Sequence, residues 1–207
     1  ASNTKIYEFT NEVMANFKGE ANRRNIDFQL SCKNKNLELF IDRNLMDKVY
    51  FNLLSNAFKF TPDNGKISIL ILESQDNTVK ISFKDSGIGI PDNELYNVFN
   101  PFFKASNNNK NSSGIGLHLS KEFVLLHHGT IELKSKHGSE VVITLLKGNS
   151  HLVANEIINT TENLPLISNL ITDNLDIESD FKEVNLVPET EKHSILLIED
   201  NSDLVAF

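Results

Sequence analysis

Residues 85–91 read Asp85-Ser86-Gly87-Ile88-Gly89-Ile90-Pro91, and the rest of the chain can be interpreted as the support of this turn. Two glycines and a proline in seven residues favour a tight turn whose backbone can pass close against a flat ligand. The carboxylate of Asp85 accepts hydrogen bonds and donates none, which suits the exocyclic amine of adenine and not the carbonyl of guanine. Taken alone, the same stretch also fits an ordinary turn at the end of a strand.

The composition predicts a soluble globular protein. Of 207 residues, 40% are hydrophobic, which is enough for a core. The net charge of −8 argues against general affinity for nucleic acid or an anionic membrane, since both need clustered Lys and Arg. No apolar run approaches the roughly 18 to 20 residues that cross a bilayer. Cys32 is the only cysteine and indicates a reducing compartment, so we expect a cytoplasmic location.

Hydrophobic periodicity predicts alternating helices and strands up to about residue 147. Apolar residues four apart predict a helix over residues 5–24. Asp42 is the expected N-cap of a second helix that ends near residue 60, before the turn residues 61–65. A short helical piece should follow Pro91, and another helix should span residues 114–128. The expected strands are residues 26–30, 37–41, 66–72, 79–83, 130–135 and 140–146.

The helix before residue 60 carries a polar stripe. At about 100° per residue, Asn52, Asn56 and Lys59 lie within roughly 60° of one another at the edge of an apolar face. An Asn side-chain oxygen can bind Mg²⁺, which takes its other ligands from water and substrate phosphates. Lys59 could neutralise a phosphate. The two asparagines could equally be capping or surface amides.

A second glycine pair, Gly114 and Gly116, stands at the start of the helix over residues 114–128. Free backbone N–H groups and the helix dipole at such a position attract phosphate. This pattern is also a common way to begin a helix without any ligand. The preceding residues 105–113 are almost entirely Ser, Asn and Lys, so we expect that segment to be mobile.

Considered in order, the motifs are an Asn-x-x-x-Asn-x-x-Lys helix, an Asp-x-Gly-x-Gly turn, a Phe-Phe-Lys segment, a polar loop and a Gly-x-Gly-Leu helix start. Over residues 9–146 the chain resembles the ATP-binding catalytic domain of sensor histidine kinases, a relative of DNA gyrase and the ninety-kilodalton heat-shock chaperones. The resemblance implies an α+β fold, the Bergerat two-layer α/β sandwich, with a mixed sheet of about five strands packed on three helices.

The resemblance also implies roles for residues 52–60, 85–89, 99–103 and 114–117, with residues 100–113 as the ATP lid. Asn56 would hold Mg²⁺ with support from Asn52, and Lys59 and Lys104 would meet phosphates. Phe60 would lie along the base that Asp85 reads. The catalytic residues would be Asn52, Asn56 and Lys59. The ATP-binding residues implied by the family are Asn52, Asn56, Lys59, Phe60, Asp85, Gly87, Ile88, Gly89, Phe103, Lys104, Gly114, Ile115, Gly116 and Leu117.

Asn52 bears on the reaction. Hydrolytic members of the superfamily carry a glutamate there to activate water, and an amide cannot act as a general base near neutral pH. The expected reaction is therefore transfer of the γ-phosphate of ATP to a histidine. None of the six histidines lies in the expected acceptor pattern, and His127 and His128 suit a helix C-terminus. The acceptor should belong to a separate dimerisation domain, so this chain alone should not autophosphorylate.

Residues 148–192 are strongly acidic and predict a linker, and residues 193–207 resemble the first strand of a receiver domain. The whole resembles part of a hybrid histidine kinase in two-component signalling, with residues 1–147 as the catalytic domain. Its partners would be the phosphoacceptor domain and the receiver, and the chain itself should be monomeric. Whether a full-length protein is anchored in the inner membrane stays open. The alternatives are a catalytically silent nucleotide-sensing module and a gyrase- or chaperone-like ATPase.

Overall fold

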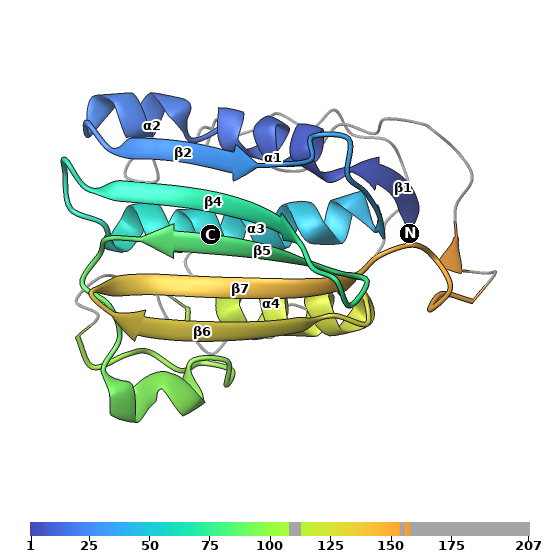
Figure 1. Ribbon diagram of the computed structural model, residues 1–207. Helices are drawn as coiled ribbons and strands as arrows, with labels where there is room; N and C mark the ends of the chain where they lie inside the picture. The colour runs from blue at the N-terminus through green and yellow to red at the C-terminus, as the bar shows by residue number, and fades with distance from the viewer. Residues whose placement is uncertain (108–112, 154–155, 158–207) are drawn as a thin grey trace, which may run out of the picture. The chain divides into compact units, whose positions relative to one another are not determined.

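The computed structural model describes residues 1–107, 113–153 and 156–157. The helices are α1 (Ile6–Ala15), α2 (Lys18–Arg23), α3 (Arg43–Phe60), α4 (Gly116–Leu126) and the 3-10 helix η1 (Asp92–Asn97). The strands are β1 (Ser2–Lys5), β2 (Asp27–Cys32), β3 (Glu38–Ile41), β4 (Lys66–Glu73), β5 (Thr78–Asp85), β6 (Thr130–Lys136) and β7 (Gly138–Leu146). Figure 1 shows the strands of the larger sheet in front, with α3 and α4 behind them.

Five strands form one mixed sheet in the order β2-β4-β5-β7-β6. Strand β2 runs parallel to β4, and the other three pairs are antiparallel. Helix α3 lies behind the middle of the sheet and α4 behind β7 and β6, so the helices occupy a single layer (Figure 1). The predicted two-layer sandwich is therefore confirmed. Among the described residues, no helix is both long and apolar enough to cross a membrane.

The N-terminal region differs from the sequence prediction in two ways. The single helix expected over residues 5–24 is wrong, because the chain breaks between α1 and α2 at Asn16 and Phe17. The break allows the Phe17 ring to stack on Phe58 of α3 at 5.2 Å. Strand β1, which was not predicted, pairs with β3 in a small sheet of its own. Spacing along the chain cannot reveal either feature, since both depend on distant partners.

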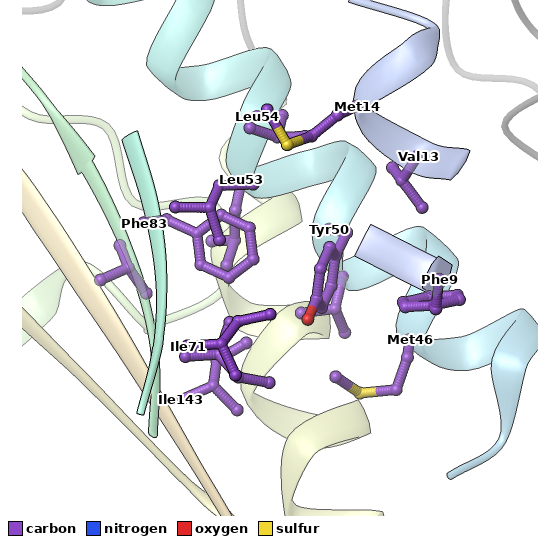
Figure 2. Packing of buried hydrophobic residues seen from close by; sticks show 14 of the residues in the cluster. Phe9, Val13, Met14, Met46, Tyr50, Leu53, Leu54, Ile71, Phe83 and Ile143 are labelled. Carbon is purple, nitrogen blue, oxygen red and sulfur yellow. The ribbon is translucent and has the colours of Figure 1, made fainter. Parts of the chain in front are cut away.

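The core lies between α1, α3 and the sheet, with Tyr50 of α3 at its centre (Figure 2). The Tyr50 ring is fully buried and meets Phe9 at 5.0 Å and Phe83 at 4.8 Å, both edge to face. Burying an aromatic or aliphatic side chain of this size contributes roughly 1.5–3 kcal/mol. This packing holds the apolar face of α3 against the sheet and leaves the polar stripe at its edge.

Both ends of α3 are secured by side chains. The Oδ1 atom of Asp42 accepts hydrogen bonds from the backbone N–H groups of Asn44 at 2.9 Å and Leu45 at 3.1 Å, which confirms the predicted N-cap. At the other end, the Arg24 guanidinium donates to the carbonyl of Phe58 at 2.6 Å and to that of Thr61. Carbonyls at the last turn of a helix otherwise lack partners. The position of α3 is thereby set at both termini.

Candidate functional site

A cavity of about 360 Å³ opens between α3, the turn after β5, the segment after η1 and the start of α4. This volume is within the range of small-molecule sites. All the site residues predicted from the sequence line it except Gly87 and Ile115, which are chain neighbours of lining residues. Residues far apart in the sequence thus meet at one cavity. The predicted residues that line it are Asn52, Asn56, Lys59, Phe60, Asp85, Ile88, Gly89, Phe103, Lys104, Gly114, Gly116 and Leu117.

The polar stripe of α3 forms one wall. The side-chain amide of Asn52 donates to the hydroxyl of Ser120 on α4 at 2.8 Å. The side chain of Asn56 makes no hydrogen bond within the part of the chain that the structure describes, so its amide oxygen is available to a ligand. The Lys59 ammonium lies 5.5 Å from the centre of the Phe60 ring. The amide oxygen is a ligand that fits Mg²⁺, and the neighbouring ammonium fits a phosphate bound together with the metal.

The turn after β5 forms another wall. The Oδ1 atom of Asp85 accepts hydrogen bonds from the backbone N–H groups of Gly87 at 2.7 Å and Ser139 at 3.2 Å. Burial raises the pKa of the Asp85 carboxyl above its usual value, and these two hydrogen bonds act in the opposite direction. A half-buried carboxylate facing a cavity is the kind of group that functional sites retain.

The glycines of this turn are required by the protein's own packing. A Cβ atom on Gly87 would lie 2.6 Å from the carbonyl oxygen of Phe60, at the end of α3. Gly89 has a φ of 69°, which disfavours any other residue, and its Cβ would lie 2.8 Å from the hydroxyl of Ser135. The sequence suggested that the backbone of this turn passes close to a ligand. At least some of its close contacts are instead with neighbouring strands and helices of the protein itself.

The second glycine pair brings α4 against the segment around Phe103. A Cβ on Gly114, whose φ is 73°, would lie 2.7 Å from the backbone of Phe102 and Phe103. A Cβ on Gly116 would lie 2.1 Å from Oδ1 of Asn52. Helix α4 begins at Gly116, two residues later than predicted. The amide of Asn107 donates to the carbonyl of Gly89 at 2.9 Å, and residues 108–112 of the predicted mobile segment lie outside the described chain.

Four lining residues from the sheet were not predicted: Phe83, Leu133, Ser139 and Val141. They form an apolar floor with one hydroxyl. Alternation along the predicted strands marked Phe83, Leu133 and Val141 as inward-facing, yet that signal is the same for core and cavity residues. Ser139 was predicted to lie in the turn before the last strand. Only the packing of α3 and α4 on the sheet decides which inward-facing side chains line the cavity and which are covered by the helices.

The fold and cavity define a catalytic domain of the histidine kinase type. The catalytic domain of histidine kinase ThkA superposes with a TM-score of 0.64 at 28% identity, covering 70% of this chain and 96% of that domain. Residues 41–149 match the family described as histidine kinase-, DNA gyrase B- and HSP90-like ATPases. The chain belongs to this family.

Two longer proteins are similar to this chain over nearly its whole length. Histidine kinase P4 of Formosa agariphila is 31% identical over 217 residues, covering 100% of this chain and 16% of the relative. Sensor histidine kinase TmoS of Ectopseudomonas mendocina is 31% identical over 210 residues, covering 98% and 21% respectively. The chain thus spans about a fifth or less of the length of these relatives.

Proposed function

We propose that this chain binds ATP with Mg²⁺ and supplies the γ-phosphate to a histidine on a separate dimerisation and phosphoacceptor domain. The observation that carries the proposal is the meeting of the Asn52–Asn56–Lys59 stripe, the Asp85 turn and the Gly114–Gly116 helix start at one cavity. Each motif alone has a structural explanation. Their convergence supports a nucleotide site with a base end and a phosphate end.

The base end would be the Asp85 wall. The carboxylate offers an acceptor to the amine of adenine, and its two backbone hydrogen bonds set its orientation. Phe60, Ile88 and the apolar floor supply surfaces for a flat ring. Guanine would place a carbonyl against the carboxylate and leave a buried acceptor unpaired, which is unfavourable.

The phosphate end would lie between α3 and the start of α4. Asn56 would hold Mg²⁺, while Lys59, Lys104 and the backbone around Gly114 and Gly116 would face the phosphates. When bound, Mg²⁺ would offset negative charge on the phosphates. The role of this chain is therefore to position ATP, because phosphoryl transfer depends chiefly on orientation and charge stabilisation.

Phosphoryl transfer is favoured over hydrolysis because no carboxylate among the described lining residues lies at the proposed phosphate end. Among the described lining residues, Asp85 is the only carboxylate, and it lies at the proposed base end. Asn52 stands where a general base would be needed, and its amide is engaged with Ser120. An amide cannot remove a proton from water near neutral pH.

The larger context follows from the relatives. P4 and TmoS are named histidine kinases, and their alignments cover 100% and 98% of this chain. Hybrid signal transduction histidine kinase D of Dictyostelium discoideum is 34% identical over 120 residues. These likenesses support a place in two-component signalling. We infer in addition a hybrid kinase in which 148–192 is a linker and 193–207 begins a receiver. The separate phosphoacceptor domain and the receiver would be the partners of a cytoplasmic, monomeric catalytic module.

Asp85→Ala tests the nucleotide site directly. We expect ATP affinity measured by calorimetry to fall about 10- to 100-fold, because hydrogen bonds to charged groups are worth about 1.5–3 kcal/mol. Asp76→Ala is the matched control, since Asp76 lies in the exposed β4–β5 turn and bonds only to Thr78 among the interactions described. Unchanged ATP affinity in Asp85→Ala would overturn the proposal.

Two alternative functions can be distinguished by activity assays on the same purified chain. A silent nucleotide-sensing module would bind ATP but fail to phosphorylate an added phosphoacceptor domain. A gyrase- or chaperone-like ATPase would show steady-state release of inorganic phosphate from the chain alone. Appreciable hydrolysis would contradict the argument from Asn52.

A further inference from the structure

The hairpin between β6 and β7 carries a buried hydroxyl that joins it to the Asp85 turn. Ser135 Oγ accepts a hydrogen bond from the backbone N–H of Ile90 at 2.7 Å and donates one to the carbonyl of Gly138 at 2.9 Å. The Ser135 residue is only 6% exposed, so these bonds form away from water. Loss of the hydroxyl would remove the hydrogen bond that it accepts from Ile90 and the one that it donates to Gly138, which is costly for partly buried groups.

At Gly138 the backbone of the hairpin lies directly against the backbone of the turn. A Cβ on Gly138, whose φ is 89°, would lie 2.0 Å from the carbonyl oxygen of Asp85. A Cβ on Gly89 would lie 2.8 Å from Ser135 Oγ and 3.3 Å from the carbonyl oxygen of Gly138. A shift of the hairpin by a few tenths of an ångström would therefore be felt directly by the turn.

The same hairpin supplies a donor to the Asp85 carboxylate. The backbone N–H of Ser139 reaches Asp85 Oδ1 at 3.2 Å, and Ser139 follows the glycine whose carbonyl Ser135 holds. Ser135 thus acts on Asp85 by two routes, through Ile90 on the turn and through Gly138 on the hairpin. Its own side chain does not line the cavity.

We propose that Ser135 is a positioning residue for nucleotide recognition, which orients the Asp85 carboxylate by bracing the β6–β7 hairpin against the turn of residues 85–91. This inference rests on the proposed function, since it assigns Ser135 to the base end of the same site. It concerns selectivity for adenine more than general affinity, because the brace contacts neither α3 asparagine nor the helix start at Gly116.

The test compares ATP and GTP binding by the 207-residue chain and its Ser135→Ala variant, measured by displacement of a fluorescent nucleotide. We expect ATP affinity to fall about 5- to 30-fold, as for one unsatisfied buried polar group. GTP binding makes no use of the Asp85 acceptor, so the affinity for GTP should change little. The ratio of ATP affinity to GTP affinity should therefore decrease. Thermal melting of each variant would report on folding.

Ser82→Ala is the matched control. Ser82 is also buried in the sheet, but its hydroxyl donates to the carboxylate of Glu140 at 2.6 Å and touches no part of the turn. Both nucleotide affinities should stay within about twofold of the parent chain, because the hydroxyl of Ser82 bonds to Glu140 and not to the turn of residues 85–91. Ser135→Cys carries a weaker hydrogen-bonding group of similar shape, so its ratio of ATP to GTP affinity should lie between those of the parent chain and Ser135→Ala. This variant replaces Ser135→Ala in the test if Ser135→Ala does not fold.

Either of two outcomes would overturn the inference. ATP affinity unchanged in folded Ser135→Ala would show that the brace is not needed. A parallel fall for ATP and GTP, with their ratio preserved, would show that Ser135 only stabilises the fold. Failure of the parent chain to bind ATP at all would instead overturn the proposed function, so the two failures are distinguishable.

Discussion

The behaviour of single residues depends on which neighbours satisfy their polar atoms. Asp85 keeps a carboxylate in a half-buried place because two backbone N–H groups bond to it. His127 is almost fully buried between α3 and α4: its Nε2 accepts from the backbone N–H of Asp42 at 2.9 Å, and its Nδ1 lies 2.7 Å from the carbonyl of Phe123. The carbonyl cap expected of His127 is confirmed, and both contacts together require the neutral ring with its proton on Nδ1.

His127 predicts an acid-sensitive fold. Burial lowers the pKa of His127, against the opposing effects of the Phe123 carbonyl and the Asp42 carboxylate; the amino terminus and His128 lower it further. The folded state therefore prefers the neutral ring, and this stability is present above the ordinary histidine pKa of about 6.5 and is lost as the pH falls. The free energy of unfolding, measured by urea denaturation, should decrease from pH 7.5 to pH 5.

His127→Gln should flatten that pH dependence, because glutamine does not titrate. His137→Gln is the control, since His137 is exposed in the β6–β7 turn. In the control, the free energy of unfolding should decrease with falling pH as steeply as in the parent chain. An equally steep slope in His127→Gln would assign the acid sensitivity to other groups.

At the scale of the elements, the site depends on how closely α3 and α4 approach each other. The two helices meet where Gly116 faces Asn52 and where Ser120 accepts the Asn52 amide. A side chain at position 116 would occupy the place of the Asn52 amide. The glycine is therefore required here by a neighbouring helix as well as by any phosphate.

Gly116→Ala should displace the Asn52 amide and break its bond to Ser120. We expect ATP affinity measured by calorimetry to fall about 5- to 30-fold, while the chain stays folded. Gly19→Ala is the matched control, because a Cβ at Gly19 of α2 would meet nothing within 4 Å. That control should bind ATP normally and gain about 0.5–1 kcal/mol of stability from helix propensity. Wild-type affinity in Gly116→Ala would show that the Asn52 position is not critical.

At the scale of the whole molecule, the proposed function predicts that phosphoryl transfer requires a separate acceptor domain. Incubation with labelled ATP and an isolated phosphoacceptor domain of a related histidine kinase should transfer label to that domain. The chain alone should stay unlabelled, since none of its six histidines lies in an acceptor pattern. Transfer should fall by about tenfold or more with Asp85→Ala, in line with weaker ATP binding. Label on the chain alone would contradict the prediction of a separate acceptor.

Much of this molecule follows from local sequence patterns. The periods of 2 and 3.6 residues located β4, β5, β6, β7 and α3, because a half-buried strand or helix must place apolar residues on one face. The Asp42 cap and the turn after Phe60 marked the ends of α3. The order of the Asn, Asp-Gly and Gly-Gly motifs supported the family resemblance, and that resemblance predicted one common site.

Other features were decided only by tertiary structure. The pairing of β1 with β3, the parallel pairing of β2 with β4, and the break that places Phe17 on Phe58 all join segments whose local patterns are silent about their partners. The same holds for Ser135 and Gly138, which lie about fifty residues after the turn that they brace. A pattern along the chain specifies which face of an element is buried, whereas the partner on that face is chosen by packing of the whole fold. That is why Asp85 could be recognised from its neighbours in sequence, while the hairpin that orients it could not.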